Sequence, residues 1–372
     1  MNYKIKEISE IINGATPSTS KPNYWNGNID WITPKDLTNF SGRFIFHGRV
    51  PITKEGYDSC STKLVPEGTI LLSSRAPIGY LAIAGKEVCT NQGFKSIICN
   101  PNKVNNIYLY YWLSTKVDYL QSISNGATFK ELSKETLENV LIDLPTMEKQ
   151  QHIVNTIGGV DDLIENYQER INKIADILSK SLEKYPNKIT IDHYNPILIK
   201  SGINKFNDNK EYLDTSSVEG INNISIGETI TYDQRPSRAN MQPIPDSVWF
   251  AKMKGSYKNL IIGKSDVDLI DSNILSTGFQ GIKASRELPL SLLTAFIISK
   301  DFNSQRDLNS VGTTMAGINN ETFMKINVPL LTESKIKEFD NKYRLLVDEL
   351  SILRRKINSL KQEKSLLLSK YF

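Results

Sequence analysis

The residues best suited to chemistry in this chain are basic and hydroxyl side chains gathered in two regions. The first region contains Lys35, Arg43, Arg49, Ser73 and Arg75, and the second contains Arg235, Arg238, Lys252, Lys254, Tyr257 and Lys258. Arginine and lysine neutralise phosphates or donate to guanine edges, and hydroxyl groups serve both purposes. Any one of them is more often an ordinary surface residue. As two clusters in corresponding regions of a repeated chain, they make contact with DNA a working hypothesis.

Catalytic motifs are weak by comparison. The run Gly263-Lys264-Ser265 imitates the end of a phosphate-binding loop, but Lys258 stands where the first glycine of that motif belongs, so we expect a turn between strands. Glu333-Ser334-Lys335 has the acid-x-lysine spacing of a nuclease centre, yet it falls where a helix is expected to begin. The histidines are scattered, at His47, His152 and His193. We therefore predict no catalytic residue and no metal site.

The elements that must position the two clusters are two long amphipathic helices, which repeat each other. Apolar residues recur at steps of four and three, the seam of a helix that packs against another helix. The first seam is Ile153, Ile157, Val160, Ile164, Tyr167, Ile171, Ile174 and Leu178. Adding 186 to each number gives Phe339, Tyr343, Leu346, Leu350, Leu353, Ile357, Leu360 and Lys364, so only the last position is polar.

The repeat extends beyond the helices. Residues 124–145 and 310–331 align without gaps at the same offset, and each long helix ends in Lys-Tyr, at Tyr185 and Tyr371. The chain is therefore read as a tandem duplication. Two differences stand out: Gly158-Gly159 predicts a looser or bent start of the first helix, and Lys364 lies opposite no obvious acid in sequence.

Composition agrees with a two-domain globular protein. The chain has 372 residues, with 45 Lys and Arg against 41 Asp and Glu, which permits nucleic-acid binding without requiring it. No apolar run reaches membrane-spanning length and no signal peptide is recognisable, so a cytoplasmic location is expected. The three cysteines lack C-x-x-C spacing, so no disulfide or zinc site is expected.

Local patterns divide the chain into four parts. We expect a first mixed domain at 1–145, a first spacer helix at 146–185, a second mixed domain at 186–331 and a second spacer helix at 332–372. In the first domain, apolar and β-branched runs predict strands at 69–72, 80–84 and 95–99, and helical spacing predicts one helix over 104–120.

Several stretches resemble the specificity subunits of type I restriction-modification systems. They are GATPSTS with YWNGNIDWITPKDL near the start, the TNQGF run at 90–94, and the LP boundary with MEKQQHI before a long helix ending in Lys-Tyr. The resemblance covers essentially the whole chain, although the second half lacks an obvious GATPS equivalent. It implies an α+β fold in which two target-recognition domains are separated by two long antiparallel coiled-coil helices, with a pseudo-twofold internal repeat.

The same resemblance implies a non-catalytic, DNA-reading subunit. Each variable domain is expected to read one half of a bipartite, asymmetric site, with the helix pair as spacer. Two methyltransferase subunits would bring S-adenosylmethionine, and endonuclease subunits that use ATP and magnesium would join them, while this chain binds no cofactor itself. Two alternatives stay open: an enzyme with fused recognition domains, and a coiled-coil scaffold or protein-binding module without DNA selectivity.

Overall fold

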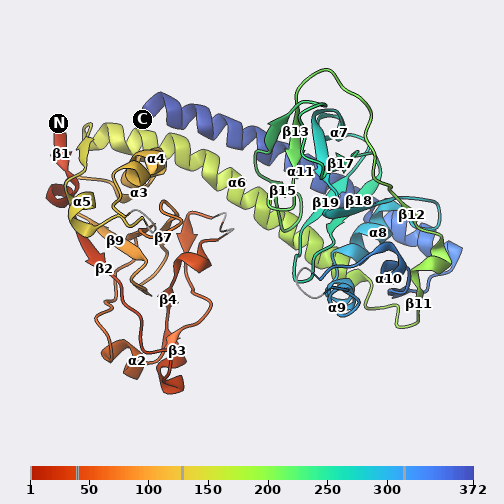
Figure 1. Ribbon diagram of the computed structural model, residues 1–372, viewed down its shortest axis with the longest axis horizontal. Helices are drawn as coiled ribbons and strands as arrows, with labels where there is room; N and C mark the ends of the chain where they lie inside the picture. Colours follow the sequence, from red (N-terminus) through yellow and green to blue (C-terminus); the bar gives the residue numbers. More distant parts are fainter. Residues whose placement is uncertain (1, 39, 41, 127–129, 313–315) are drawn as a thin grey trace. The chain divides into compact units, whose positions relative to one another are not determined.

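The computed structural model describes residues 2–38, 40, 42–126, 130–312 and 316–372, and it divides into two compact units. The first unit is Met1–Asp162 with Gln362–Phe372, and the second is Leu163–Lys361. Two long helices, α6 (Met147–Ser181) and α11 (Glu333–Tyr371), each contribute to both units (Figure 1). In the described part of the chain, no helix is long and apolar enough to cross a membrane.

The first unit is built from short strands and helices. Before α6 its strands are β1 (Asn2–Lys4), β2 (Ser9–Asn13), β3 (Trp25–Ile29), β4 (Trp31–Ile32), β5 (Phe44–Ile45), β6 (Ile70–Ser73), β7 (Leu81–Ala84), β8 (Cys89–Thr90), β9 (Phe94–Cys99) and β10 (Leu141–Asp143). Its helices are α1 (Ile5–Ile8), η1 (Pro22–Tyr24), η2 (Pro34–Asp36), α2 (Lys54–Asp58), α3 (Asn106–Ser114), α4 (Val117–Ser122) and α5 (Lys134–Glu138).

The second unit follows the same plan with more strands. They are β11 (Lys188–Thr190), β12 (Ile197–Leu198), β13 (Lys210–Leu213), β14 (Val218–Glu219), β15 (Asn223–Ile224), β16 (Glu228–Ile230), β17 (Ala239–Met241), β18 (Ser247–Ala251), β19 (Asn259–Ile262), β20 (Asn273–Ser276), β21 (Phe279–Lys283) and β22 (Asn327–Pro329). The helices are η3 (Ile191–Tyr194), α7 (Val267–Ser272), α8 (Leu290–Ile297), α9 (Lys300–Leu308) and α10 (Asn320–Met324).

The prediction of one helix over 104–120 was wrong, because the structure has two shorter helices there. α3 ends at Ser114 and α4 begins at Val117. The Thr115 hydroxyl donates to the Trp112 carbonyl at 2.8 Å, and such a local side-chain bond competes with the helical hydrogen bonds at that point. The predicted strands correspond to β6, β7 and β9 within one residue at each end.

Strand pairing reproduces the duplication. β1 pairs antiparallel with β10, matching Asn2 to Asp143, and β11 pairs antiparallel with β22, matching Lys188 to Pro329, so both partners shift by the same offset. The main sheets have the orders β2-β9-β6-β7-β5 and β12-β21-β18-β19. The first four strands of one sheet correspond in order to the four strands of the other, and neighbouring strands among them are antiparallel in both sheets. A parallel pair completes each unit, β4 with β8 and β13 with β20.

Each unit buries its own hydrophobic core. In the first unit α3 lies against the main sheet, and the core includes Tyr111, Leu113, Ile153 and Ile157. In the second unit α8, α9 and α10 pack with β18, and Phe250, Phe296, Phe302 and Phe323 form a cluster of aromatic rings. The two units are therefore separately stabilised by apolar burial.

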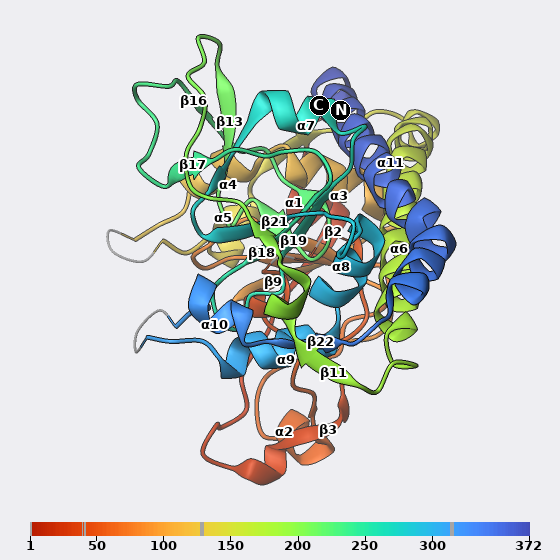
Figure 2. The same ribbon diagram turned by 90° about the vertical axis from the view of Figure 1, so that its right-hand side faces the viewer.

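The two long helices run antiparallel wherever they meet. In the second unit Lys356 lies over the Tyr167 ring and Arg170 pairs with Glu349, whereas in the first unit Asp161 pairs with Lys364. Figures 1 and 2 show the two ribbons side by side. These features confirm the predicted fold class: an internal repeat of mixed domains with a pair of long antiparallel helices.

Of the fifteen apolar seam residues, most are buried. Ile153, Ile157, Val160, Ile171, Ile174, Leu178, Phe339, Tyr343, Leu350, Leu353 and Ile357 are buried, and Ile164, Tyr167, Leu346 and Leu360 are half-buried.

One expectation about the seam was wrong. α6 is helical through Gly158 and Gly159, and its looser or bent start stays a prediction. Tyr111 and Lys364 both bond to Asp161 just after these glycines. Lys364, for which the sequence showed no acid, therefore does face one. Its partner Asp161 lies on the other helix, where sequence order gives no hint of it.

Candidate nucleic-acid interface

Three sequence stretches that carry the family resemblance meet in the first unit. The Ala15 N–H donates to the Thr90 carbonyl at 3.0 Å, and the Trp31 Nε1–H donates to the Ala15 carbonyl at 3.0 Å. Asn91 N–H donates to the Ile32 carbonyl at 3.0 Å. A Cβ on Gly14 would lie 2.2 Å from the Asn91 carbonyl oxygen, so only glycine permits this approach. The loops 14–20, 31–37 and 90–94 thus form one framework.

Next to this framework lies a charged cluster made by Arg75, Lys95 and Glu131. Arg75 Nε is 3.2 Å and Lys95 Nζ is 3.6 Å from opposite oxygens of the Glu131 carboxylate. Lys95 is almost fully buried and also donates to Ser74 Oγ at 3.3 Å. Burial lowers the pKa of Lys95, and Glu131 opposes that shift. Of these residues, sequence reasoning had selected Arg75 alone.

The other candidates of the first unit are divided between surface and interior. Lys35 and Arg49 are exposed, and Arg49 is held by the Asp36 carboxylate and by the Lys35 carbonyl. Ser73 is fully buried, and its hydroxyl donates to the Pro77 carbonyl at 2.8 Å, which shapes the turn after β6. Arg43 is buried and pairs with acids of α6, so its charge serves to hold that helix.

In the second unit Arg238 and Lys252 line a groove of about 660 Å³. Thr277, Asn319 and Glu321 lie on its walls. Burial, and then the neighbouring Arg238, lowers the pKa of Lys252. Among the residues that the structure describes, no carboxylate is paired with either cation. This groove therefore attracts anions.

Of the remaining candidates of the second unit, Lys254, Tyr257 and Lys258 lie in or next to the turn that follows β18, and Arg235 lies in the loop after β16. Tyr257 donates its hydroxyl to Asp307 at 3.1 Å, and the buried Arg306 donates to the Ser256 carbonyl at 2.5 Å. Lys254 is exposed, Lys258 donates to the Thr215 carbonyl at 2.8 Å, and Arg235 stacks on the Tyr232 ring. Arg306 and Asp307 were missed, because they lie about fifty positions from the turn they hold.

Hydrogen bonds show which loop positions correspond in the two units. Ser74 N–H donates to the Gly93 carbonyl, and its own carbonyl accepts from Leu132 N–H; Lys252 makes the same bonds with Gly278 and Ile318. The backbone of Arg75 forms an isolated antiparallel β-bridge with that of Glu131, and Met253 forms the equivalent β-bridge with Gly317. Equivalent backbone positions therefore carry different side chains, which is the arrangement expected of two modules that recognise different targets.

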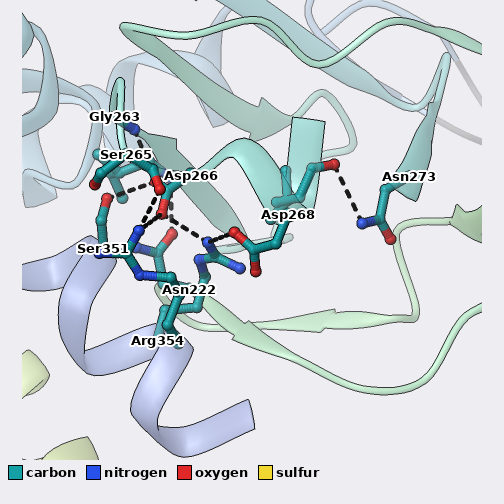
Figure 3. Close-up of polar contacts among 11 residues, drawn as sticks. Asn222, Gly263, Ser265, Asp266, Asp268, Asn273, Ser351 and Arg354 are labelled. Carbon is teal, nitrogen blue, oxygen red and sulfur yellow. Dashed lines mark hydrogen bonds and ion pairs between the residues drawn. The ribbon is translucent and has the colours of Figure 1, made fainter. Parts of the chain in front are cut away.

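A buried ionic network attaches the second unit's turn 263–266 to α11 (Figure 3). The Asp266 carboxylate is fully buried and accepts hydrogen bonds from Ser351 Oγ at 2.6 Å and Arg354 Nη2 at 2.7 Å. It also accepts from Gly263 N–H at 2.8 Å. The glycine-lysine-serine run is thus a turn between β19 and α7, bound by its own chain. Sequence patterns had missed the roles of Asp266 and Arg354.

Among the described residues, no group of three or more His, Cys, Asp or Glu side chains converges to hold a metal ion. The three cysteines are free thiols. Cys89 is buried, which raises the pKa of its thiol to about 12 and leaves it protonated and inert.

Two repeated mixed domains joined to an antiparallel helix pair, with differently charged loops on a common framework, define a class of modular recognition proteins. Residues 1–176 match the family model of the type I restriction modification DNA specificity domain. This match over a little under half of the chain supports the resemblance to type I restriction-modification specificity subunits that the sequence had implied.

Relatives with curated names agree with this resemblance. The MjaIX specificity subunit of Methanocaldococcus jannaschii is 47% identical over 183 residues, which are 49% of this chain and 42% of that protein. The EcoR124I/EcoR124II specificity subunit of Escherichia coli is 28% identical over 187 residues, 48% of this chain and 45% of that protein. The matched stretch thus spans less than half of either relative.

A solved structure extends the likeness of fold to the whole chain. The type I restriction-modification S subunit from M. genitalium aligns with a TM-score of 0.53 at 15% identity, covering 100% of this chain and 96% of that one. At this identity, the match concerns the fold.

Proposed function

We propose that this chain is the non-catalytic subunit that gives a type I restriction-modification complex its DNA sequence specificity. Its variable domains, 1–145 and 186–331, each read one half of a bipartite, asymmetric site in double-stranded DNA. The common framework with different charged loops supports this division of labour. Arg75 with Glu131 occupies the loop cluster in the first unit, and Arg238 with Lys252 occupies it in the second.

The helix pair, 146–185 with 332–372, sets the spacing between the two half-sites in this proposal. α6 has 35 residues and α11 has 39. At about 1.5 Å per residue, α6 is about 50 Å long, which exceeds one turn of B-DNA at about 34 Å. Two domains carried by such helices can meet one duplex at two separate places.

The same helices would dock two methyltransferase subunits, and endonuclease subunits would join through the complex. Large apolar side chains lie on the outer faces of both helices: Leu163, Ile177, Leu345, Ile352 and Leu366. Leu345 is 78% exposed and Ile352, one heptad later, is 43% exposed, which suits a partner helix. S-adenosylmethionine, ATP and magnesium would belong to those partners.

The observation that carries this proposal is the family match of residues 1–176 together with the repeated, differently charged loop clusters. The test is to co-express the chain with its methyltransferase subunit and to map modified adenines by long-read sequencing. A split motif with a fixed gap is expected. Methylation without a motif would refute DNA reading and favour the scaffold alternative, and methylation by the purified chain alone would favour an enzyme.

A further inference from the structure

The Glu131 carboxylate stands between two cations of unequal exposure. The Arg75 side chain is 50% exposed and Glu131 41%, whereas Lys95 is 6% exposed. An exposed arginine and an exposed carboxylate are thus presented together, and a buried lysine holds the carboxylate from behind. The pair offers donors and an acceptor to a ligand at one place.

The fold does not require these charges. In the second unit the equivalent backbone bridge joins Met253 to Gly317, and Gln280 occupies the strand position of Lys95. There Ile318 N–H donates to the Lys252 carbonyl and Lys252 N–H donates to the Gly278 carbonyl without the charged trio. Exposed ion pairs also add only about 0–1 kcal/mol to stability. A role in recognition therefore explains the exposed pair of Arg75 and Glu131 better than a role in folding does.

The backbone fixes how the two exposed side chains lie. Arg75 and Glu131 face each other in an antiparallel bridge, and Glu131 exchanges two backbone hydrogen bonds with Asn125, at 2.8 and 3.1 Å. Residues opposite each other in such a bridge project to the same side. Neighbouring bonds from Leu132 N–H to the Ser74 carbonyl anchor the bridge to the sheet at 2.9 Å.

Such a pair matches the edge of one base pair. In the major groove, guanine presents two acceptors, O6 and N7, and its partner cytosine presents the N4 amino donor beside them. Arginine is the usual partner of the guanine acceptors, and a carboxylate accepts from cytosine N4. We propose that Arg75 and Glu131 together read one G·C base pair, Arg75 donating to guanine and Glu131 accepting from cytosine. Lys95 is the positioning residue that holds Glu131.

The pair would also reject the alternatives. In a reversed C·G pair, Arg75 would face the cytosine donor and Glu131 the guanine acceptors, so both contacts would be repulsive. With adenine in place of guanine, the N6 amino group would oppose the guanidinium, and thymine O4 would oppose the carboxylate. Unmatched polar groups of this kind are costly when desolvated.

This inference rests on the proposed function, and the test keeps the two apart. The wild-type chain, assembled with its methyltransferase subunits, is first mapped for its methylated motif; absence of a motif would count against the proposed function itself. Glu131→Gln is then mapped in the same complex. We expect one G·C position of one half-site to become degenerate, with a loss of discrimination there of about 10- to 100-fold.

Matched variants separate reading from folding. Glu135→Gln changes the same charge at an exposed site and should leave the motif unchanged. Lys95→Met should relax the same base pair and Lys95→Arg should restore it, because the carboxylate is held again. The double variant Lys95→Met/Glu131→Gln removes the buried charge with its partner, so it should fold and relax that pair.

Several outcomes would overturn the inference. They are an unchanged motif in Glu131→Gln, relaxation at an A·T position, or relaxation in both half-sites. Loss of all methylation in both Glu131→Gln and the double variant, with complexes assembled, would also overturn it, because losing one base contact relaxes a motif and does not abolish it.

Discussion

Lys364 Nζ lies 2.7 Å from Asp161 Oδ1, and this ion pair is where the two copies of the seam differ most. At the offset of the repeat, the equivalent residues are Leu178 and Val347, and both are buried in the core of the second unit. One copy thus uses a charged contact where the other uses an apolar one. A polar residue at a single seam position can fix the register of paired helices.

The environment of Asp161 shows why this pair is tolerated. The carboxylate also accepts from the Tyr111 hydroxyl at 2.7 Å, and Arg43 Nε lies 3.9 Å away. Burial, and then Asp161, raises the pKa of Tyr111, so the phenol remains a donor at any physiological pH.

Asp161→Ala should lower the free energy of unfolding by about 3 kcal/mol, because it leaves buried cationic and hydroxyl groups without their acceptor. Urea unfolding of the full chain measures this loss. Asp176→Ala is the control: its side chain is 60% exposed and that of its partner Lys180 is 65% exposed, so we expect a loss below about 1 kcal/mol. Equal losses in the two variants would contradict the role assigned to Asp161.

Lys252→Met should raise stability while weakening DNA binding. The pKa of Lys252 is lowered by burial, so at neutral pH its charge costs stability; that cost disappears as pH rises from the lowered pKa toward 10.5. We expect a gain of up to about 1 kcal/mol at pH 7, which shrinks as the pH rises through that window. The slope of log affinity against log salt should fall by about one unit.

The exposed Lys254 provides the comparison for Lys252. Lys254→Met should reduce the salt slope if it contacts phosphate, but it should not change stability, because its charge is already solvated. Thermal melting and a salt series with the assembled complex give both quantities. A destabilised Lys252→Met, or one with an unchanged salt slope, would refute an anion site in this groove.

Asp307→Asn should loosen the turn that carries Tyr257. Burial alone would raise the pKa of Asp307, but the Gly255 N–H, Arg306 and Tyr257 outweigh it and hold that pKa below 3.8. The resulting stabilisation is complete above the unfolded pKa and is lost as pH falls through the folded one. The variant should lose about 1–2 kcal/mol at pH 7, and the difference should vanish at lower pH.

The control for Asp307 is Asp271→Asn at an exposed position, for which we expect little change at any pH. The measurement is the free energy of unfolding of the wild type and both variants at pH 7, 4 and 2.5. A difference between wild type and Asp307→Asn that grows on acidification would have the wrong sign for the proposed interactions.

Inserting seven residues into each long helix, after Asp162 and after Lys361, should lengthen the gap between half-sites without changing their sequences. Seven residues add about 10 Å, which corresponds to about three base pairs. Long-read methylation mapping reads the gap directly. The control inserts seven residues in α6 alone, which shifts the seam of α6 relative to the seam of α11 and so disrupts their pairing. Altered half-site sequences in the double insertion would argue against a spacer.

Much of the architecture could be predicted from the sequence. A helix that buries one face shows an apolar residue every three or four positions, and a duplicated chain shows the same pattern again at a fixed offset. The seam from Ile153 to Leu178 and its copy from Phe339 predicted two paired helices. The contacts between charged loop residues could not be predicted in the same way. Arg75 was chosen because arginine is a common DNA-binding residue, but Lys95 and Glu131 lie far from it in sequence and belong to no motif.

By itself, the sequence determined the duplication, the two long helices, the mixed domains and the family resemblance. Tertiary structure decided which charges meet: Lys364 with Asp161, Arg354 with Asp266, and Arg75 with Glu131. The physical reason is that apolar periodicity repeats within a few residues, whereas an ion pair depends on the distance between two atoms that only the folded backbone brings together.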